Sequence, residues 1–256
     1  MVVLPDIRDI KNVSSIILAH VHSFNSMWFF TNHGVSHSSS VENYVEQIIK
    51  ICDLCGIELN DAEKAILRCA CWLHDIGRIR EQNGLNHALE SVNVIRILCD
   101  KGHLNLGAIK DEIEYVVSAH SSKGLPLANV EMERPISGAN YNVRLKLLCA
   151  LFKIADECDI DRLRAPKSVY DVLEDLMPES SRFHWVRTWN VIRVVLSYEE
   201  RKIIIHIVEG SHEEDILESL TKTLKDERIK QVLVQYKFPV VDYCIQYHPP
   251  VDISQD

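Results

Sequence analysis

The residues of this sequence that are best suited to chemistry are histidines and aspartates. Twelve of the 256 residues are histidine, and one of them stands beside an aspartate in residues 73–77 (LHDIG). His74 and Asp75 come at the end of an otherwise apolar helical pattern. A polar pair in such a position costs free energy unless it is hydrogen-bonded or bound to a cation. We therefore expect His74 and Asp75 to lie at the centre of a functional site.

Four further residues fit around this pair: His37, His87, His120 and Asp156. Asp156 interrupts residues 141–158, which are apolar nearly all round and so predict a central buried helix. A buried carboxylate must be paired or must coordinate a cation. Imidazoles together with carboxylates suit Mn²⁺, Fe²⁺, Co²⁺, Ni²⁺ or Zn²⁺ at a catalytic site with open coordination positions.

The predicted elements place these side chains at helix ends. Apolar residues recur with a helical period in five segments, and Asn60 with Glu63 predicts a capping box at the start of the second. The expected helices cover residues 39–55, 60–76, 87–100, 105–120 and 141–158. His37 then precedes the first helix, His87 opens the third and His120 closes the fourth.

The segment between residues 121 and 140 contains Gly124, Pro126, Pro135 and Gly138 and has no helical period. A stretch of this length without regular structure is often a functional lid. Lys123 and Arg134 lie within it and are cations suited to meeting an anionic group of a substrate. The alternative is a plain surface connector, whose length costs little because loop-closure entropy grows slowly.

The pattern changes after Pro166. A short helix at 169–177 precedes two β-type runs, 191–196 and 202–208, which predict a hairpin with one buried face. Ser211 and Glu214 predict the start of another helix, and residues 240–247 predict a last strand. The fold class is therefore mainly α, with a helical domain at 1–165 and a smaller α+β lobe at 166–256.

Composition excludes several classes of protein. The chain is 46% apolar and 25% charged, and no apolar run approaches the length of about 20 residues that a membrane span needs. A formal net charge of −9 argues against binding to long nucleic acids, which usually require a basic surface. Asp6, Arg8 and Asp9 interrupt the stretch where a secretory signal would be apolar, so we expect a cytoplasmic protein without a membrane partner.

The ordered segments that contain His37, His74-Asp75 and Asp156 resemble the His…His-Asp…Asp signature of the HD-domain metal-dependent phosphohydrolases. Residues 32–38 (NHGVSHS) are similar to the first-histidine segment of that family, and residues 151–156 (LFKIAD) to its last-ligand helix. The resemblance covers about residues 28–165. It implies an HD-type helical bundle for this part of the chain.

The resemblance also implies a ligand set. His37, His74, Asp75 and Asp156 would hold one divalent ion, and Asp75 would bridge to a second ion held by His87 and His120. One or two ions of Mn, Fe, Co, Ni, Mg or Zn are expected, with a metal-bridged hydroxide as the nucleophile on phosphorus. His87 and His120 could instead be polar helix ends that line the pocket.

Several cations could stabilise charge on the phosphoryl oxygens. Arg78 directly follows the central motif, and Lys123, Arg144 and Lys153 are further candidates. We expect catalytic roles for Asp75, Arg78 and Lys153, and substrate binding by Arg78, Lys123 and Arg144. His33 is expected to support a ligand or contact the substrate.

The expected function is a metal-dependent phosphohydrolase or phosphodiesterase acting on a nucleotide or other small phosphorylated compound. One alternative is an HD-type nuclease, which the acidic balance disfavours. Another is a regulatory module that binds a nucleotide without turnover, or a subunit that works with a partner chaperone or ATPase. The lobe after Pro166 would then contact the partner protein or a second copy of the chain.

Overall fold

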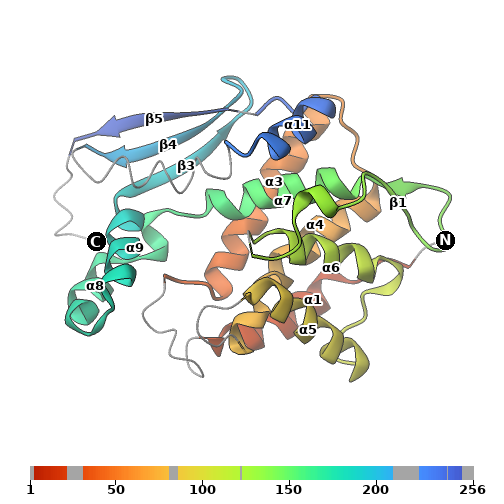
Figure 1. The fold of residues 1–256 in the computed structure, drawn as a ribbon, viewed down its shortest axis with the longest axis horizontal. Coiled ribbons are helices and arrows are strands. Elements are labelled where there is room, and N and C mark those ends of the chain that lie inside the picture. Colours follow the sequence, from red (N-terminus) through yellow and green to blue (C-terminus); the bar gives the residue numbers. More distant parts are fainter. Residues whose placement is uncertain are drawn as a thin grey trace.

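The computed structural model describes residues 3–21, 31–80, 86–121, 123–209, 225–240 and 242–249. Helices make up most of this part of the chain, and a small sheet lies against one end of the helical body (Figure 1). The α-helices are α1 (Ile7–Leu18), α3 (Val35–Leu54), α4 (Asp61–Leu73), α5 (His87–Asp100), α6 (Lys110–Ala119), α7 (Leu145–Cys158), α8 (Lys167–Leu173), α9 (Glu179–Trp189) and α11 (Glu227–Gln235). Short 3₁₀ helices are η1 (Ile76–Arg80), η2 (Gly107–Ile109), η3 (Leu127–Asn129), η4 (Arg162–Arg164) and η5 (Glu174–Leu176).

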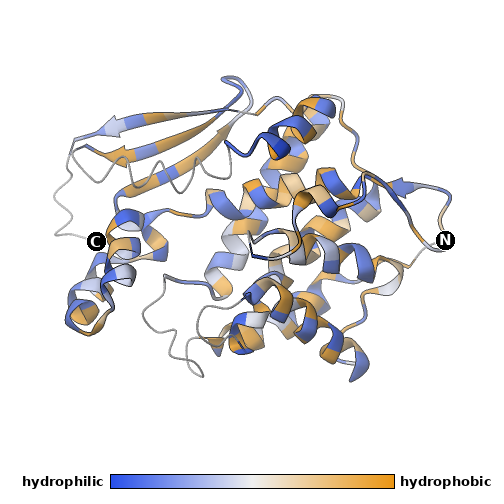
Figure 2. Ribbon diagram, viewed as in Figure 1, coloured by the Kyte–Doolittle hydropathy of each residue, from blue (hydrophilic) through white to orange (hydrophobic). Residues whose placement is uncertain are grey.

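Capping and burial account for two of the predicted helices, α4 and α7. The predicted capping box at α4 is present: the Glu63 backbone N–H donates to the Asn60 side chain at 2.9 Å, and the Asn60 backbone N–H donates to the Glu63 carboxylate at 3.0 Å. α7 is buried along most of its length, as expected for a central helix. Orange and blue segments alternate along the surrounding helices, which bury one apolar face each (Figure 2).

The larger sheet has the strand order β3–β4–β5 and comprises β3 (Val191–Ser197), β4 (Lys202–Val208) and β5 (Asp242–His248). β3 and β4 form the predicted antiparallel hairpin, with Val194 opposite Ile205. β5 pairs in parallel with β4, with Ile245 opposite Ile205. A parallel neighbour needs a long crossover, so β5 returns to the sheet only after the chain has passed through α11.

One apolar core extends from the helical body into the sheet. Its buried members include residues from α3, α4, α6 and α7, and also Val191, Ile205 and Leu233 from the C-terminal part. The Tyr44 hydroxyl on α3 donates to the Val194 carbonyl on β3 at 3.1 Å. A separate small cluster packs α8 against α9 around Tyr170 and Trp185. The large core thus has members on both sides of the division predicted at residue 165, which stays a prediction.

The structure confirms the predicted fold class, a mainly helical protein with a small C-terminal sheet that includes a hairpin. Several boundaries differ from the prediction. α3 begins at Val35 rather than residue 39, and α7 begins at Leu145 rather than 141. Segment 121–140 contains η3 and the strand β1 (Arg134–Pro135), which pairs with β2 (Asn142–Val143). α1, α9 and α11 were not predicted, and the helix expected after Ser211 lies outside the described residues.

Candidate metal centre

The predicted ligands come together from five helices of the bundle. One group consists of His37 in the first turn of α3, His74 at the C-terminal cap of α4 and Asp156 near the end of α7. The two imidazole Nε2 atoms are 3.0 Å apart, and each lies close to Asp156 Oδ1, at 3.3 Å from His37 and 3.5 Å from His74. Both histidines are buried. Two imidazoles and a carboxylate thus face one small volume.

A second group adjoins the first through Asp75. His87, the first residue of α5, and His120, the C-terminal cap of α6, have their Nε2 atoms 3.0 Å apart. Asp75 Oδ1 lies 3.6 Å from the His87 nitrogen and 3.9 Å from the His120 nitrogen. The other oxygen, Oδ2, lies 3.7 Å from Nε2 of both His37 and His74. Asp75 therefore turns one oxygen toward each pair of histidines.

The geometry fits divalent cations. Two nitrogen ligands at about 2.1 Å from an ion and at right angles to each other are about 3.0 Å apart, which is the spacing of both Nε2 pairs. Asp75 Oδ1 is buried and makes no hydrogen bond in the described part of the chain. A buried carboxylate oxygen without a donor is costly, and a cation would satisfy it. The residues present therefore fit one ion at each pair of histidines.

The Nδ1 atoms of three histidines are held by acceptors, which directs Nε2 into the site. The imidazoles of His74 and His120 each donate from Nδ1 to the carbonyl oxygen three residues earlier in the chain, at 3.0 and 2.6 Å. His37 Nδ1 donates to Asp159 Oδ2 at 2.6 Å, and the Ser40 hydroxyl donates to the other oxygen of Asp159 at 2.6 Å. Such partners fix the tautomer and ring orientation of metal-binding histidines.

Close packing at Gly77 brings α5 to the central motif. A Cβ at Gly77 would lie 2.0 Å from the Ser91 nitrogen and 2.6 Å from the His87 carbonyl oxygen, so only glycine lets these backbones meet. The Gly77 N–H donates to the Ser91 hydroxyl at 2.9 Å, and that hydroxyl donates to the His74 carbonyl at 2.5 Å. The start of α5, and with it His87, is thereby anchored beside His74.

Charge at the site is set by burial and by a few ion pairs. Burial opposes ionisation of Asp75, but the Arg78 guanidinium and His74 outweigh it and hold the pKa of Asp75 well below its usual range. Arg78 Nε lies 2.9 Å from Asp75 Oδ2. Burial lowers the pKa of His87 to about 3 and that of His120 to about 4. Both imidazoles are therefore neutral at neutral pH, which is the form that binds metal.

The predicted cationic residues occupy different environments. Arg78 is buried at the site and paired with Asp75. Lys153 is half-buried on α7, three residues before Asp156, and Lys123 is exposed three residues after His120. Arg144 and Arg134 lie away from the histidines.

Arg144 and Arg134 hold structural carboxylates. Arg144 Nε donates to Glu63 Oε1 at 2.8 Å, and Glu63 lies in the first turn of α4. His74 is eleven residues further along this helix, about 16 Å away. Arg134 Nε lies 3.0 Å from Glu112 Oε1, and its guanidinium stacks over the Tyr115 ring at 5.1 Å. The structure does not bring these two arginines together with the metal-binding groups.

Two polar residues that support the site were not predicted. Asp159 accepts from His37, and Arg164 contacts Asp159, Asn32 and His33. His33 was expected near the site, and its Nδ1 lies 3.0 Å from Asp75 Oδ2. The sequence contains one signal for Asp159, namely its position three residues after Asp156. No sequence pattern marks Arg164.

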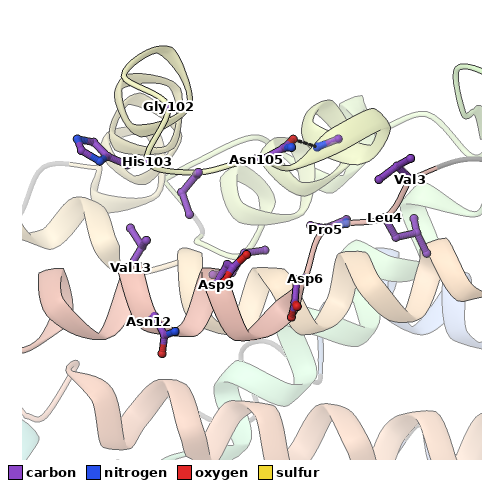
Figure 3. A pocket seen from close by; sticks show the side chains of 13 residues that line it. Val3, Leu4, Pro5, Asp6, Asp9, Asn12, Val13, Gly102, His103 and Asn105 are labelled. Carbon is purple, nitrogen blue, oxygen red and sulfur yellow. Dashed lines mark hydrogen bonds between the residues drawn. The ribbon is translucent and has the colours of Figure 1, made fainter.

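A separate cavity lies between the start of α1 and the connection from α5 to α6 (Figure 3). Its volume is about 510 Å³, and its lining includes Asp6, Asp9, Asn12, His103 and Asn105. None of the predicted metal-binding or cationic site residues lines it. The cavity is thus distinct from the metal centre.

Comparison with known families gives one match. The family model HD-CE matches residues 27–231, a range that includes every candidate metal ligand and extends into the sheet. No curated protein matches the chain. Among the described residues, none of the helices has both the length and the apolar character needed to cross a membrane. With a matched range that covers most of the chain and a largely buried cluster of histidines and aspartates suited to metal, this protein belongs to the HD-CE family.

Proposed function

We propose that this protein is a divalent-metal-dependent phosphohydrolase or phosphodiesterase that acts on a nucleotide or another small phosphorylated compound. The observation that carries the proposal is the sharing of Asp75 between two pairs of histidines, with one carboxylate oxygen turned toward each pair. Paired divalent ions are a recurrent feature of phosphatases and nucleases. The family match supports an HD-type domain and leaves the reaction to experiment.

His37, His74 and Asp156 would hold one ion, His87 and His120 the other, and Asp75 would contact both. Divalent ions bound there would polarise phosphoryl oxygens and make water nucleophilic near neutral pH. The protein would hold the ligands in a fixed orientation. The anchored Nδ1 atoms keep the imidazoles oriented, so little reorganisation is needed when a substrate binds.

Arg78 is the cation closest to the proposed reaction site. Its guanidinium is fixed beside Asp75 Oδ2, and only 11% of the Arg78 side chain is exposed. A fixed cation in a water-poor site stabilises charge that develops on transferring phosphoryl oxygens. We assign Arg78 this role, with Lys153 and Lys123 as secondary candidates for contact with the phosphate.

A small substrate is favoured over a polynucleotide. The chain has 28 Lys and Arg against 37 Asp and Glu, and long nucleic acids are generally bound through many basic contacts. A compact phosphate ester needs only the metal centre and a few cations. The acidic charge balance therefore supports a nucleotide-sized substrate.

Turnover by the metal-loaded protein tests the proposal. The full chain is freed of metal, loaded with Mn²⁺ and incubated with a panel of nucleotides and with bis(p-nitrophenyl) phosphate, and the phosphate and nucleoside products are separated. The matched control is the Asp75→Asn variant treated in the same way. Hydrolysis that requires Mn²⁺ and is lost in the variant supports the proposal.

Two outcomes would replace the proposal by an alternative. Degradation of single-stranded DNA without hydrolysis of nucleotides would indicate a nuclease. Saturable nucleotide binding with no product from any substrate would indicate a regulatory module.

A further inference from the structure

Arg164 connects two segments that are distant in the sequence. It is the last residue of η4, which follows the end of α7, and 12% of its side chain is exposed. Its backbone carbonyl accepts from the Asn32 N–H at 2.9 Å, and its Nε donates to the Asn32 carbonyl at 3.0 Å. These two hydrogen bonds fasten the chain just before α3 to the chain just after α7.

The same guanidinium reaches the carboxylate that orients His37. One terminal nitrogen donates to the Asp159 carbonyl at 2.5 Å, and Nε lies 3.6 Å from Asp159 Oδ2. That oxygen accepts from His37 Nδ1 at 2.6 Å. Movement of Asp159 would therefore be passed directly to the imidazole of a candidate metal ligand.

The remaining terminal nitrogen lies against His33. It is 2.9 Å from His33 Nδ1, which is itself 3.0 Å from Asp75 Oδ2. Arg164 thus approaches the metal centre along two routes, through Asp159 to His37 and through His33 to Asp75.

We propose that Arg164 is a positioning residue of the metal centre, which sets the geometry of His37 and Asp75 for metal binding by fixing Asp159 and His33. The inference rests on the proposed metal centre and does not depend on which substrate is hydrolysed. The planar guanidinium donates to the Asn32 and Asp159 carbonyls and lies against the His33 ring at the same time, whereas a lysine ammonium acts as a point charge on a flexible chain. Replacement by lysine would therefore keep the charge and lose the positioning.

The test is the affinity of the full-length, metal-free protein for Mn²⁺, measured by isothermal titration calorimetry for the wild type, Arg164→Ala and Arg164→Lys. Loss of groups that orient metal ligands commonly weakens metal binding by about 10–100-fold. We expect a loss in this range for both variants. The control is Arg68→Ala, which removes an arginine that makes two hydrogen bonds to Glu46 on the surface, away from the metal centre. It should bind Mn²⁺ like the wild type.

Two further measurements separate positioning from a general structural role. The visible absorption spectrum of the Co²⁺-loaded protein reports the ligand geometry and should change in Arg164→Lys but not in Arg68→Ala. Arg164→Ala and Asp159→Asn should be non-additive when combined, because the arginine acts partly through that carboxylate. Arg164→Lys and Asp159→Asn also keep the test valid if the alanine variant does not fold.

The inference is overturned if both Arg164 variants bind Mn²⁺ within twofold of the wild type and give its Co²⁺ spectrum, even when their melting temperatures fall. A wild-type protein that binds no Mn²⁺ would overturn the metal centre itself, and with it the proposed function. The two failures are therefore distinguishable.

Discussion

Replacing Asp75 by asparagine tests the centre of the site with almost no change in shape. The Asp75 carboxylate is buried, with 2% of the side chain exposed, and lies 2.9 Å from Arg78 Nε. Removing one partner of a buried ion pair typically costs about 3–5 kcal/mol, because the other charge stays buried and uncompensated. The asparagine carbonyl still accepts a hydrogen bond, so we expect about 3 kcal/mol, the lower end of that range. For a chain of this length, that lowers the melting temperature of the metal-free protein by about 6–12 °C.

The same substitution should abolish tight metal binding. Asp75 turns an oxygen toward each pair of histidines, so its loss leaves neither ion fully coordinated. We expect affinity for Mn²⁺ to fall at least 100-fold, which corresponds to about 2.7 kcal/mol. Elemental analysis of the purified protein and calorimetric titration measure this effect.

A matched control and a second variant separate the two effects. Asp171→Asn removes an exposed aspartate that lies 2.7 Å from Lys167, and such surface pairs contribute about 0–1 kcal/mol. Adding Arg78→Gln to Asp75→Asn also removes the guanidinium that the Asp75 carboxylate had balanced, and should recover most of the melting temperature without restoring metal. Wild-type metal content in Asp75→Asn would refute the assignment of Asp75 as a ligand.

Four further predictions follow from the contacts. A crystal soaked in Mn²⁺ should show two ions about 3.5–4 Å apart, and a single ion with His87 and His120 directed away would exclude the second site. The pKa of His120 is lowered from 6.5 to about 4, so the folded state resists its protonation. In the metal-free protein, neutral His120 therefore contributes to the free energy of unfolding above about pH 6.5, and this contribution is lost as the pH falls toward 4. Acid unfolding scans should show a smaller loss of stability for His120→Gln than for the wild type. Glu63→Ala should cost about 3 kcal/mol in urea unfolding, because it leaves the partly exposed Arg144 without a carboxylate partner, while Mn²⁺ affinity stays unchanged. Lys123→Ala should lower kcat/KM about tenfold if the segment after His120 meets the phosphate, about 1.4 kcal/mol of transition-state stabilisation, whereas a change within twofold would make it a plain connector.

Most helices that bury a regular apolar stripe were predicted, although α1 and α11, which also bury apolar residues, were missed. α4, α5 and α7 bury regular apolar stripes. The first turn of α3 instead buries His37 and Ser38, so the apolar period begins only at Val41 and the predicted start came four residues late. α9 buries Ser181, Trp185 and Thr188, a stripe with helical spacing but too polar to be recognised from hydropathy. Polar functional residues at a helix end and weak amphipathicity therefore both remove the periodic apolar pattern from which a helix is predicted.

The parallel pairing of β5 with β4 could not be predicted, for a different reason. Residues 242–248 have a strand-like composition, but their parallel pairing with β4 depends on the path of the chain through α11. The prediction that the lobe after Pro166 contacts a partner or a second copy stays untested. Val172 and Leu176, which are 77% and 67% exposed, would be the first residues to replace in such a test.

The ligands and the cations of the site differ in how far local sequence determines them. His74 and His120 are oriented by carbonyls of their own helices, and five ordered segments contribute the six predicted ligands. An arginine side chain is long enough to reach any of several carboxylates. Which one it pairs with therefore depends on residues that are distant in the sequence. Arg144 is taken by the fully buried Glu63, 81 residues away, whereas Arg164 reaches His33 across 131 residues. The sequence therefore identifies which residues can bind metal, and the fold decides which cations remain near it.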